Sequence, residues 1–172
     1  MSDHGLHFET ELGSCALFWG RRGIRQLVIP DPVPGATLED ALAPDWVHDA
    51  ARHIKAFLAG EPSELSGIPI DLEGLPPFRQ KVYAALCATN QGETLTYGEL
   101  ARRAGSPGAA RAVGQAVRSN PLPLLVPCHR VVAANGPGGF SLMGGLKTKE
   151  RLLELEGVIL RHTGHDAAPT PR

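Results

Sequence analysis

A cysteine and a histidine stand side by side in an apolar stretch of this chain, at Cys128 and His129. Hydrophobic residues surround the pair in segment 124–132, which predicts that the cysteine is largely buried. Burial alone raises the pKa of a thiol and makes it inert, so a reactive thiolate needs an adjacent base. His129 is the neighbouring base, and a carboxylate behind the histidine would complete an activated nucleophile. The nearest downstream carboxylates are Glu150, Glu154 and Glu156.

Other interpretations of this pair involve no nucleophile. A Cys-His step inside an apolar run is often simple core packing. A thiol hydrolase or redox protein would need more, and the chain has neither a glycine-rich nucleophile turn nor a C-x-x-C pair. Adjacent Cys and His are poor zinc ligands, because structural zinc ligands are separated by intervening residues. His4, His7 and Cys15 do not form a convincing tetrahedral set either, so we expect no metal.

Charge is distributed unevenly along the chain, although the net charge is only −1. Residues 1–76 hold 5 Lys and Arg against 12 Asp and Glu, whereas residues 77–161 hold 11 against 5. A basic half favours a polyanionic partner, because phosphate contacts supply most non-specific affinity for nucleic acid. Charge alone leaves open a solvated surface without such a partner. No apolar run approaches the roughly 20 residues of a membrane helix, so we expect no membrane contact.

The acidic first half is predicted to be a small β-rich domain. β-Prone runs at 15–19 and 24–29 predict a hairpin, and residues 68–72 predict a third strand. A helix is predicted between the hairpin and this third strand, with Asp45 able to cap it and Gly60 able to end it. The apolar residues that recur at helical spacing in it are Trp46, Ala50, Ile54 and Phe57.

The prolines that follow Leu75 mark the boundary to the second domain. A helix of about ten residues comes first. Its apolar face consists of Phe78, Val82 and Leu86. Thr96 and Glu99 then match a capping box, which predicts a helix that starts at Tyr97 and ends at Gly105.

A second short helix is predicted over residues 108–118. Ser106 can cap it, with Pro107 in the first position, where a missing N–H costs little. Two short helices joined by a glycine turn form a helix-turn-helix candidate, although a helical hairpin in a core would look similar. Small residues along the second helix would let another surface approach closely.

The pentapeptide Pro-Cys-His-Arg-Val at 127–131 resembles the signature of the O6-alkylguanine-DNA alkyltransferases, also called methylated-DNA–protein-cysteine methyltransferases. Residues 92–101 resemble the first helix of that family's helix-turn-helix. Residues 109–121 resemble its recognition helix and the asparagine turn after it, and residues 144–157 resemble its C-terminal helix. These motifs follow one another at matching spacings, which makes the resemblance specific. The N-terminal half resembles the family's β-rich domain only loosely.

The resemblance implies catalytic roles for five residues. Cys128 matches the alkyl acceptor, His129 the residue that takes the thiol proton through a water, and Glu156 the carboxylate that holds this histidine. Asn120 matches the asparagine that ties the recognition helix to the active-site loop. Tyr97 matches the tyrosine whose hydroxyl meets the guanine ring, a fitting donor to guanine N3.

The resemblance also implies contacts with double-stranded DNA through the minor groove. Because O6 of guanine lies within the duplex, the base must leave the stack before a protein nucleophile can reach it. Arg111 matches the arginine that enters the stack in place of the flipped nucleotide, which offsets part of the flipping cost. The DNA-binding residues expected beside it are Tyr97, Ala110, Arg118 and Arg130.

The substrate pocket is expected to include Val131, Phe140 and Ser141. Here the chain departs from the family's pattern, in which an aromatic and a serine are followed directly by two glycines. Leu142 and Met143 separate Ser141 from the glycines, and Phe140 replaces the more common tyrosine. The resemblance therefore leaves the pocket's size and alkyl preference open.

Together these observations predict an α+β chain with a β-rich domain over 1–76, a mainly helical, winged-helix-like domain over 77–161 and a disordered tail over 162–172. The resemblance implies a cytoplasmic or nucleoid-associated monomer without cofactor. It would move one alkyl group from O6-alkylguanine, with O4-alkylthymine as a further substrate, onto Cys128. The alternative is a non-catalytic, alkyltransferase-like lesion-binding protein, but those proteins usually carry Trp where this chain has Cys128.

Overall fold

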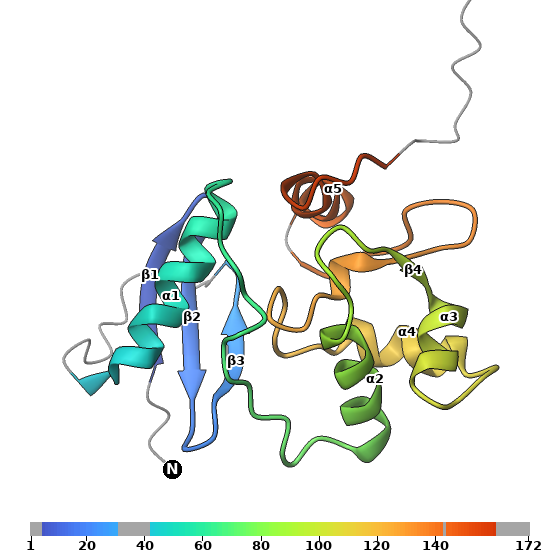
Figure 1. Ribbon diagram of the computed structural model, residues 1–172, viewed down its shortest axis with the longest axis horizontal. Helices are drawn as coiled ribbons and strands as arrows, with labels where there is room; N and C mark the ends of the chain where they lie inside the picture. The colour runs from blue at the N-terminus through green and yellow to red at the C-terminus, as the bar shows by residue number, and fades with distance from the viewer. Residues whose placement is uncertain (1–4, 31–41, 143, 161–172) are drawn as a thin grey trace, which may run out of the picture.

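The computed structural model describes residues 5–30, 42–142 and 144–160. Its first half is a three-stranded antiparallel sheet with helix α1 (Asp45–Leu58) packed against it (Figure 1). Its second half is mainly helical and contains one two-stranded parallel sheet. The α+β class that the sequence predicts is therefore confirmed. The predicted tail over 162–172 lies outside the described residues.

The sheet follows chain order, β1 (Gly5–Thr10), β2 (Gly13–Trp19) and β3 (Ile24–Val28). The hairpin β2–β3 is confirmed, whereas the sequence analysis missed β1, which pairs with β2 along its whole length. The predicted strand over 68–72 is wrong, since this segment makes only an isolated bridge between Ile70 and Ile24. Pro69 has no N–H to donate to a ladder, which limits the pairing.

Helix α1 has the predicted apolar face, with Ala50, Ile54 and Phe57 buried. Gly60 lies just beyond it with a φ of +80°, as expected for a glycine that ends a helix. The predicted cap is wrong: Pro44 occupies the N-cap position without a side-chain hydrogen bond. Asp45 is instead the first helical residue, where its negative charge favours the positive end of the helix dipole.

The second half begins with α2 (Pro77–Cys87), followed by β4 (Leu95–Thr96) and α3 (Tyr97–Arg103). The capping box is confirmed. The Glu99 amide donates to Thr96 Oγ1 at 3.2 Å, and the Thr96 amide donates to Glu99 Oε2 at 2.7 Å. The predicted stop is also confirmed, since Gly105 follows the helix in the left-handed region with a φ of +78°.

Helix α4 (Ala110–Arg118) packs against α3 but starts later than predicted. Ala109 is its N-cap residue and makes no side-chain cap, so the predicted capping by Ser106 is wrong. Gly108 has a φ of +84°, which is incompatible with a helix, and the Ala109 amide closes a turn onto the Ser106 carbonyl. The linker between the two helices therefore contains a turn over residues 106–109, which belongs to neither helix.

The active-site segment follows as a 3-10 turn, Cys128–Arg130, and then β5 (Val131–Val132), which pairs in parallel with β4. Helix α5 (Gly145–Leu155) packs against the 3-10 turn. This arrangement places the predicted Cys-His pair between β4, α4 and α5. In the described part of the chain, no helix combines the length and hydrophobicity that a membrane crossing needs.

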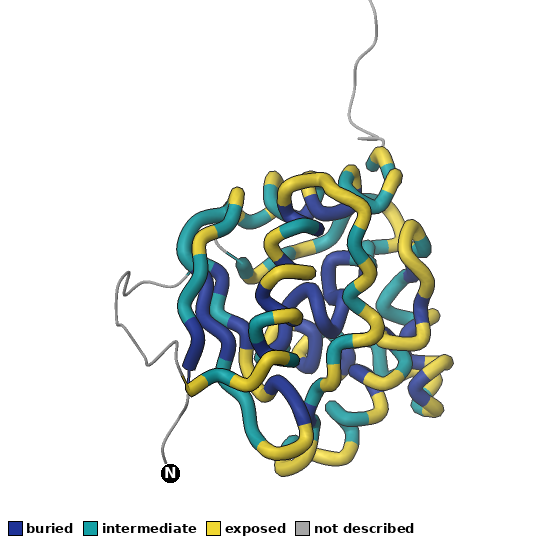
Figure 2. Tube along the Cα trace, turned by 60° about the vertical axis from the view of Figure 1, so that its left-hand side comes forward, coloured by how far each residue is buried: buried dark blue, intermediate teal, exposed yellow. Residues whose placement is uncertain are grey.

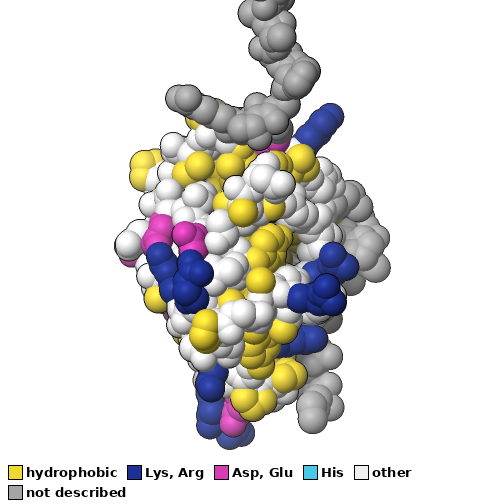
Figure 3. Space-filling view, turned by 90° about the vertical axis from the view of Figure 1, so that its right-hand side faces the viewer, with side chains coloured by type: hydrophobic (Ala, Val, Ile, Leu, Met, Phe, Trp, Pro, Cys, Tyr) yellow, Lys and Arg dark blue, Asp and Glu magenta, His cyan; other side chains and the backbone are white. Residues whose placement is uncertain are grey.

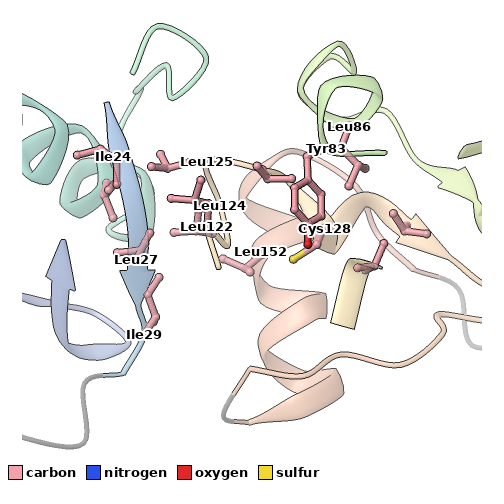
Figure 4. Packing of buried hydrophobic residues seen from close by; sticks show 14 of the residues in the cluster. Ile24, Leu27, Ile29, Tyr83, Leu86, Leu122, Leu124, Leu125, Cys128 and Leu152 are labelled. Atoms are coloured by element: carbon pink, nitrogen blue, oxygen red, sulfur yellow. The ribbon is translucent and has the colours of Figure 1, made fainter. Parts of the chain in front are cut away.

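One hydrophobic core runs across the predicted domain boundary. Side chains of β3 face Leu122, Leu124 and Leu125 of the segment that leads to Cys128 (Figure 4). The Leu27 amide also donates to the Pro121 carbonyl at 2.9 Å. Buried stretches accordingly continue from the strands into the helical half (Figure 2). The β-rich half thus supports the segment that carries the thiol.

Candidate active site

Cys128 opens onto a cavity of about 690 Å³ between α4, the start of α3 and residues 139–141. The structure brings seven of the predicted site residues to its wall: Tyr97, Ala110, Arg111, Arg118, Cys128, Phe140 and Ser141. Four further lining residues were not predicted from the sequence, namely Gly114, Gln115, Val117 and Gly139. The cavity is large enough for a small ligand that reaches the sulfur.

Asn120 holds the backbone that leads to the sulfur. Its Nδ2 donates to the Val126 carbonyl at 2.9 Å, and its Oδ1 accepts from the Leu122 amide at 2.9 Å. It therefore ties the end of α4 to the active-site loop, as predicted. Leu124 in that loop has a φ of 70°, a strained conformation for a residue with a side chain. The surrounding core holds this strained loop in place.

Behind Cys128, His129 and Glu156 form a buried pair. His129 Nε2 lies 2.7 Å from Glu156 Oε1, and the two side chains are only 1% and 2% exposed. Of the three carboxylates that follow the pair in the sequence, Glu156 is the one that reaches His129. The Gly92 amide adds a hydrogen bond to Glu156 Oε2 at 3.2 Å.

The pKa shifts indicate which protons these groups carry near neutral pH. Burial raises the pKa of the Cys128 thiol, and the Asn120 hydrogen bond and the Lys149 charge only partly oppose it. Burial lowers the pKa of His129, against the hydrogen bond and charge of Glu156. Burial opposes ionisation of Glu156 as well, but hydrogen bonds from His129 and Arg130 outweigh it and lower its pKa to about 2. The resting site holds a neutral thiol, a neutral imidazole and a carboxylate.

This charge state assigns the tautomer of His129. An ionised Glu156 can only accept a hydrogen bond, so Nε2 must carry the proton. The lone pair is then on Nδ1, which is buried and has no hydrogen-bond partner among the described residues. His129 therefore has an unused basic nitrogen inside the protein.

Lys149 is the main site residue that the sequence analysis missed. Its side chain is buried, and its Nζ donates to the carbonyls of Val131 and, at 3.1 Å, of Gly139. Nζ also lies 5.9 Å from the centre of the Phe140 ring, within reach of a cation–π interaction. Burial lowers its pKa to about 8, while Cys128 acts in the opposite direction. A lysine on an amphipathic helix gives no sequence signal of burial.

Two predicted residues lie elsewhere than expected. Val131 does not line the cavity: its side chain is buried, and its carbonyl accepts from Lys149. Arg130 does not face the cavity either. Its guanidinium binds Glu156 and Thr89 inside the protein, so it is not on the cavity rim, where the other predicted DNA-binding residues lie. A 3-10 turn has three residues per turn, so side chains two residues apart point in different directions, which separates Arg130 from Cys128.

The cavity rim carries the exposed side chains of Arg111 and Arg118 from α4. On the face with α3 and the 133–142 loop, hydrophobic side chains form a strip with Lys and Arg on both sides (Figure 3). Ser141 is exposed at this rim, and its hydroxyl donates to the Arg118 carbonyl at 3.5 Å. Met143, one of the two extra residues of this loop, lies outside the described residues.

The described residues contain no group of three or more His, Cys, Asp or Glu side chains arranged to hold a metal ion. His4, one of the donors weighed above, is not among them. The three cysteines are all free thiols, and only Cys87 is exposed. Cys128 is the thiol on the wall of the large cavity.

The segment that carries this site resembles known proteins. Residues 77–158 match the family model described as 6-O-methylguanine DNA methyltransferase, DNA binding domain. The methylated-DNA–protein-cysteine methyltransferase of Mycobacterium leprae is 48% identical over 109 residues, which are 63% of this chain and 64% of that protein. The chain thus matches just under two thirds of that relative's length.

Other relatives match over more of their length. The methylated-DNA–protein-cysteine methyltransferase of Methanosarcina acetivorans is 36% identical over 156 residues, covering 87% of this chain and 96% of that protein. A crystal structure of Mycobacterium tuberculosis OGT in complex with DNA has a TM-score of 0.72 at 36% identity, covering 89% of this chain and 92% of the other. The chain therefore belongs to the family of methylated-DNA–protein-cysteine methyltransferases.

Proposed function

We propose that this protein repairs O6-alkylguanine in double-stranded DNA by moving the alkyl group onto Cys128, once per molecule. One observation carries the proposal: Cys128 lies at a cavity wall while His129, directly behind it, is held by Glu156 at 2.7 Å. A buried thiol without such a base would be inert. The names of the relatives agree with this activity.

In the proposed reaction, Nδ1 of His129 takes the thiol proton of Cys128 through a bridging water. The thiolate attacks the alkyl carbon, an S–C bond forms as the C–O6 bond breaks, and the electron pair moves into the guanine ring. Tyr97 donates its hydroxyl proton to guanine N3 and recovers a proton from solvent, to which His129 finally returns the thiol proton. Glu156 stabilises the imidazolium by its charge. Ordinary side chains do not cleave the thioether, so the protein acts once.

We propose further that α3 and α4 act as a helix-turn-helix that approaches the minor groove of DNA as a monomer. Ala110 and Gly114 on α4 are small and line the cavity, so a DNA strand could come close to the helix there. Arg111 and Arg118 are exposed on the same rim and would meet phosphates and the base stack. Arg111 would fill the gap left by the flipped nucleotide.

The test is one exposure of the protein to an oligomer that carries O6-methylguanine. Mass spectrometry should find the mass of one CH₂ group on Cys128, and a second exposure should add nothing. Cys128→Ala should accept no label, whereas Cys87→Ala, which removes the exposed thiol, should accept it normally. Binding without any label would indicate a lesion-binding protein instead, and repeated turnover would contradict the proposal.

A further inference from the structure

A second cavity lies behind the active site. It has a volume of about 480 Å³, and Arg130 and Glu156 line it together with residues 63–66 and the end of α2. Among the residues that the structure describes, none lines both this cavity and the one that holds Cys128. His129 stands between them, almost fully buried. Arg130 therefore lies on the Glu156 side of His129, away from the cavity that holds Cys128 and that we propose receives the DNA base.

Every guanidinium nitrogen of Arg130 has a partner inside the protein. Nε lies 2.9 Å from Glu156 Oε2, and Nη2 lies 2.9 Å from Glu156 Oε1, in a bidentate pair. Nη1 donates to the Thr89 carbonyl at 3.0 Å and to Thr89 Oγ1 at 2.8 Å. The Arg130 side chain is only 12% exposed. This bidentate pair, in which two guanidinium nitrogens bind the two carboxylate oxygens, fixes the orientation of the carboxylate more strongly than a lysine could. We call it the fork.

We propose that Arg130 is a positioning residue that holds both oxygens of Glu156, so that His129 keeps its Nε2 proton and presents Nδ1 to Cys128. The inference deepens the proposed function and rests on it. Glu156 Oε1 accepts from both His129 and Arg130, so the fork and the imidazole share one oxygen. Without Arg130, the described residues left to orient the carboxylate would be His129 itself and Gly92, through its amide at 3.2 Å.

Arg130 also acts on His129 through its charge. The charged groups that face His129 are Glu156, Arg130 and Lys149, and the Cys128 thiol is its titratable neighbour. Burial and the two cations lower the pKa of His129, whereas Glu156 raises it. Because Arg130 also keeps Glu156 ionised, the proton taken from the thiol stays on the imidazole. The hydrogen bond from His129 still favours an ionised Glu156, so removal of Arg130 mainly removes a nearby positive charge and should make His129 easier to protonate.

The main experiment compares Arg130→Gln with a matched control, Arg52→Gln, which breaks the surface pair between Arg52 and Asp49 on α1. With Arg130→Gln, the single-turnover rate constant at saturating DNA should fall about tenfold at neutral pH, because the base loses its orientation. The acid limb of the rate profile should move to higher pH. DNA affinity should stay within about twofold, since Arg130 is directed away from the DNA side. The control should match the parent protein in rate constant, in the position of the acid limb and in DNA affinity.

Two further variants keep the test decisive if Arg130→Gln does not fold. Arg130→Lys retains the charge but not the fork, so the rate should fall while the acid limb moves less. Thr89→Val removes one partner of Arg130 and should lower the rate in the same direction by a smaller factor. Both changes leave the cavity that holds Cys128 untouched.

Nitrogen NMR of His129 in free protein separates this inference from the proposed function. The parent should show the Nε2-protonated tautomer, and Arg130→Gln should show a mixture and a raised pKa, whether or not DNA is repaired. Weaker DNA binding with an unchanged rate and spectrum would make Arg130 a DNA ligand and overturn the inference. An unchanged variant would overturn it as well. If the parent is never alkylated, the proposed function fails on its own.

Discussion

The hydroxyl of Tyr83 on α2 donates a hydrogen bond to the Ala116 carbonyl on α4 at 2.7 Å. Tyr83 is completely buried and lies beside Cys128 in the core (Figure 4). One side chain therefore fixes α4, which carries the rim arginines, to the packing around the sulfur. This contact links the position of α4 to the position of the thiol.

Tyr83→Phe should lower the free energy of unfolding by about 1–3 kcal/mol, because the buried Ala116 carbonyl loses a hydrogen-bond donor. Urea unfolding followed by circular dichroism measures this loss. The chain offers a matched control in its other tyrosine: Tyr97→Phe should leave stability nearly unchanged but slow alkyl transfer about 100-fold, because the proposed proton donor is gone. Equal effects of the two changes on stability would contradict the structural role of Tyr83, and normal alkyl transfer by Tyr97→Phe would contradict its role as proton donor.

Arg111→Ala should impair repair of duplex DNA much more than reaction with free O6-alkylguanine. A flipped base costs a few kcal/mol, and only the duplex reaction needs the side chain that fills the gap. We expect a rate loss of at least about tenfold with duplex and little change with the free base. Arg52→Ala, an exposed arginine on α1, serves as the control. The same loss with both substrates would exclude the flipping role.

Glu156→Gln should remove a pH-dependent part of the stability. The folded pKa of about 2 lies below the ordinary value of 4.5, so the ionised carboxylate stabilises the fold fully above pH 4.5. That contribution, on the order of 2–3 kcal/mol, disappears as the pH falls through about 2. The difference in unfolding free energy between parent and variant should therefore shrink from pH 5 to pH 2. A constant difference across this range would refute the ionised pair.

Gly138→Ala should disturb the wall of the active-site cavity. Gly138 has a φ of +75°, and an added Cβ would lie 3.1 Å from the Ala133 amide and 3.2 Å from the Tyr97 hydroxyl. The change should cost about 1 kcal/mol or more and slow alkyl transfer, since the hydroxyl must move. Gly136→Ala is the control, because its added Cβ meets no atom within 4 Å. Normal transfer by Gly138→Ala would show that the Tyr97 hydroxyl need not hold its place.

Features that depend on neighbouring residues were predictable. The capping box of Thr96 and Glu99 joins residues three apart, so its hydrogen bonds follow from local geometry. Predictions failed where the backbone of a single residue decided where a helix begins or whether a strand pairs. Because Gly108 adopts a left-handed conformation, α4 begins only at Ala110, and its N-cap residue is Ala109 instead of Ser106. Pro69 reduced a predicted strand to a single bridge, since it has no N–H.

The sequence by itself determined that a thiol and an imidazole are adjacent at Cys128 and His129 in an apolar segment, because covalent neighbours need no fold to meet. Only the tertiary structure decided that Lys149 is buried between two backbone carbonyls and that Arg130 turns away from the cavity that holds Cys128. Their partners, such as Val131 and Glu156, lie 18 and 26 residues away along the chain. Contacts at such separations depend on how helices and loops pack, and no local pattern encodes that packing.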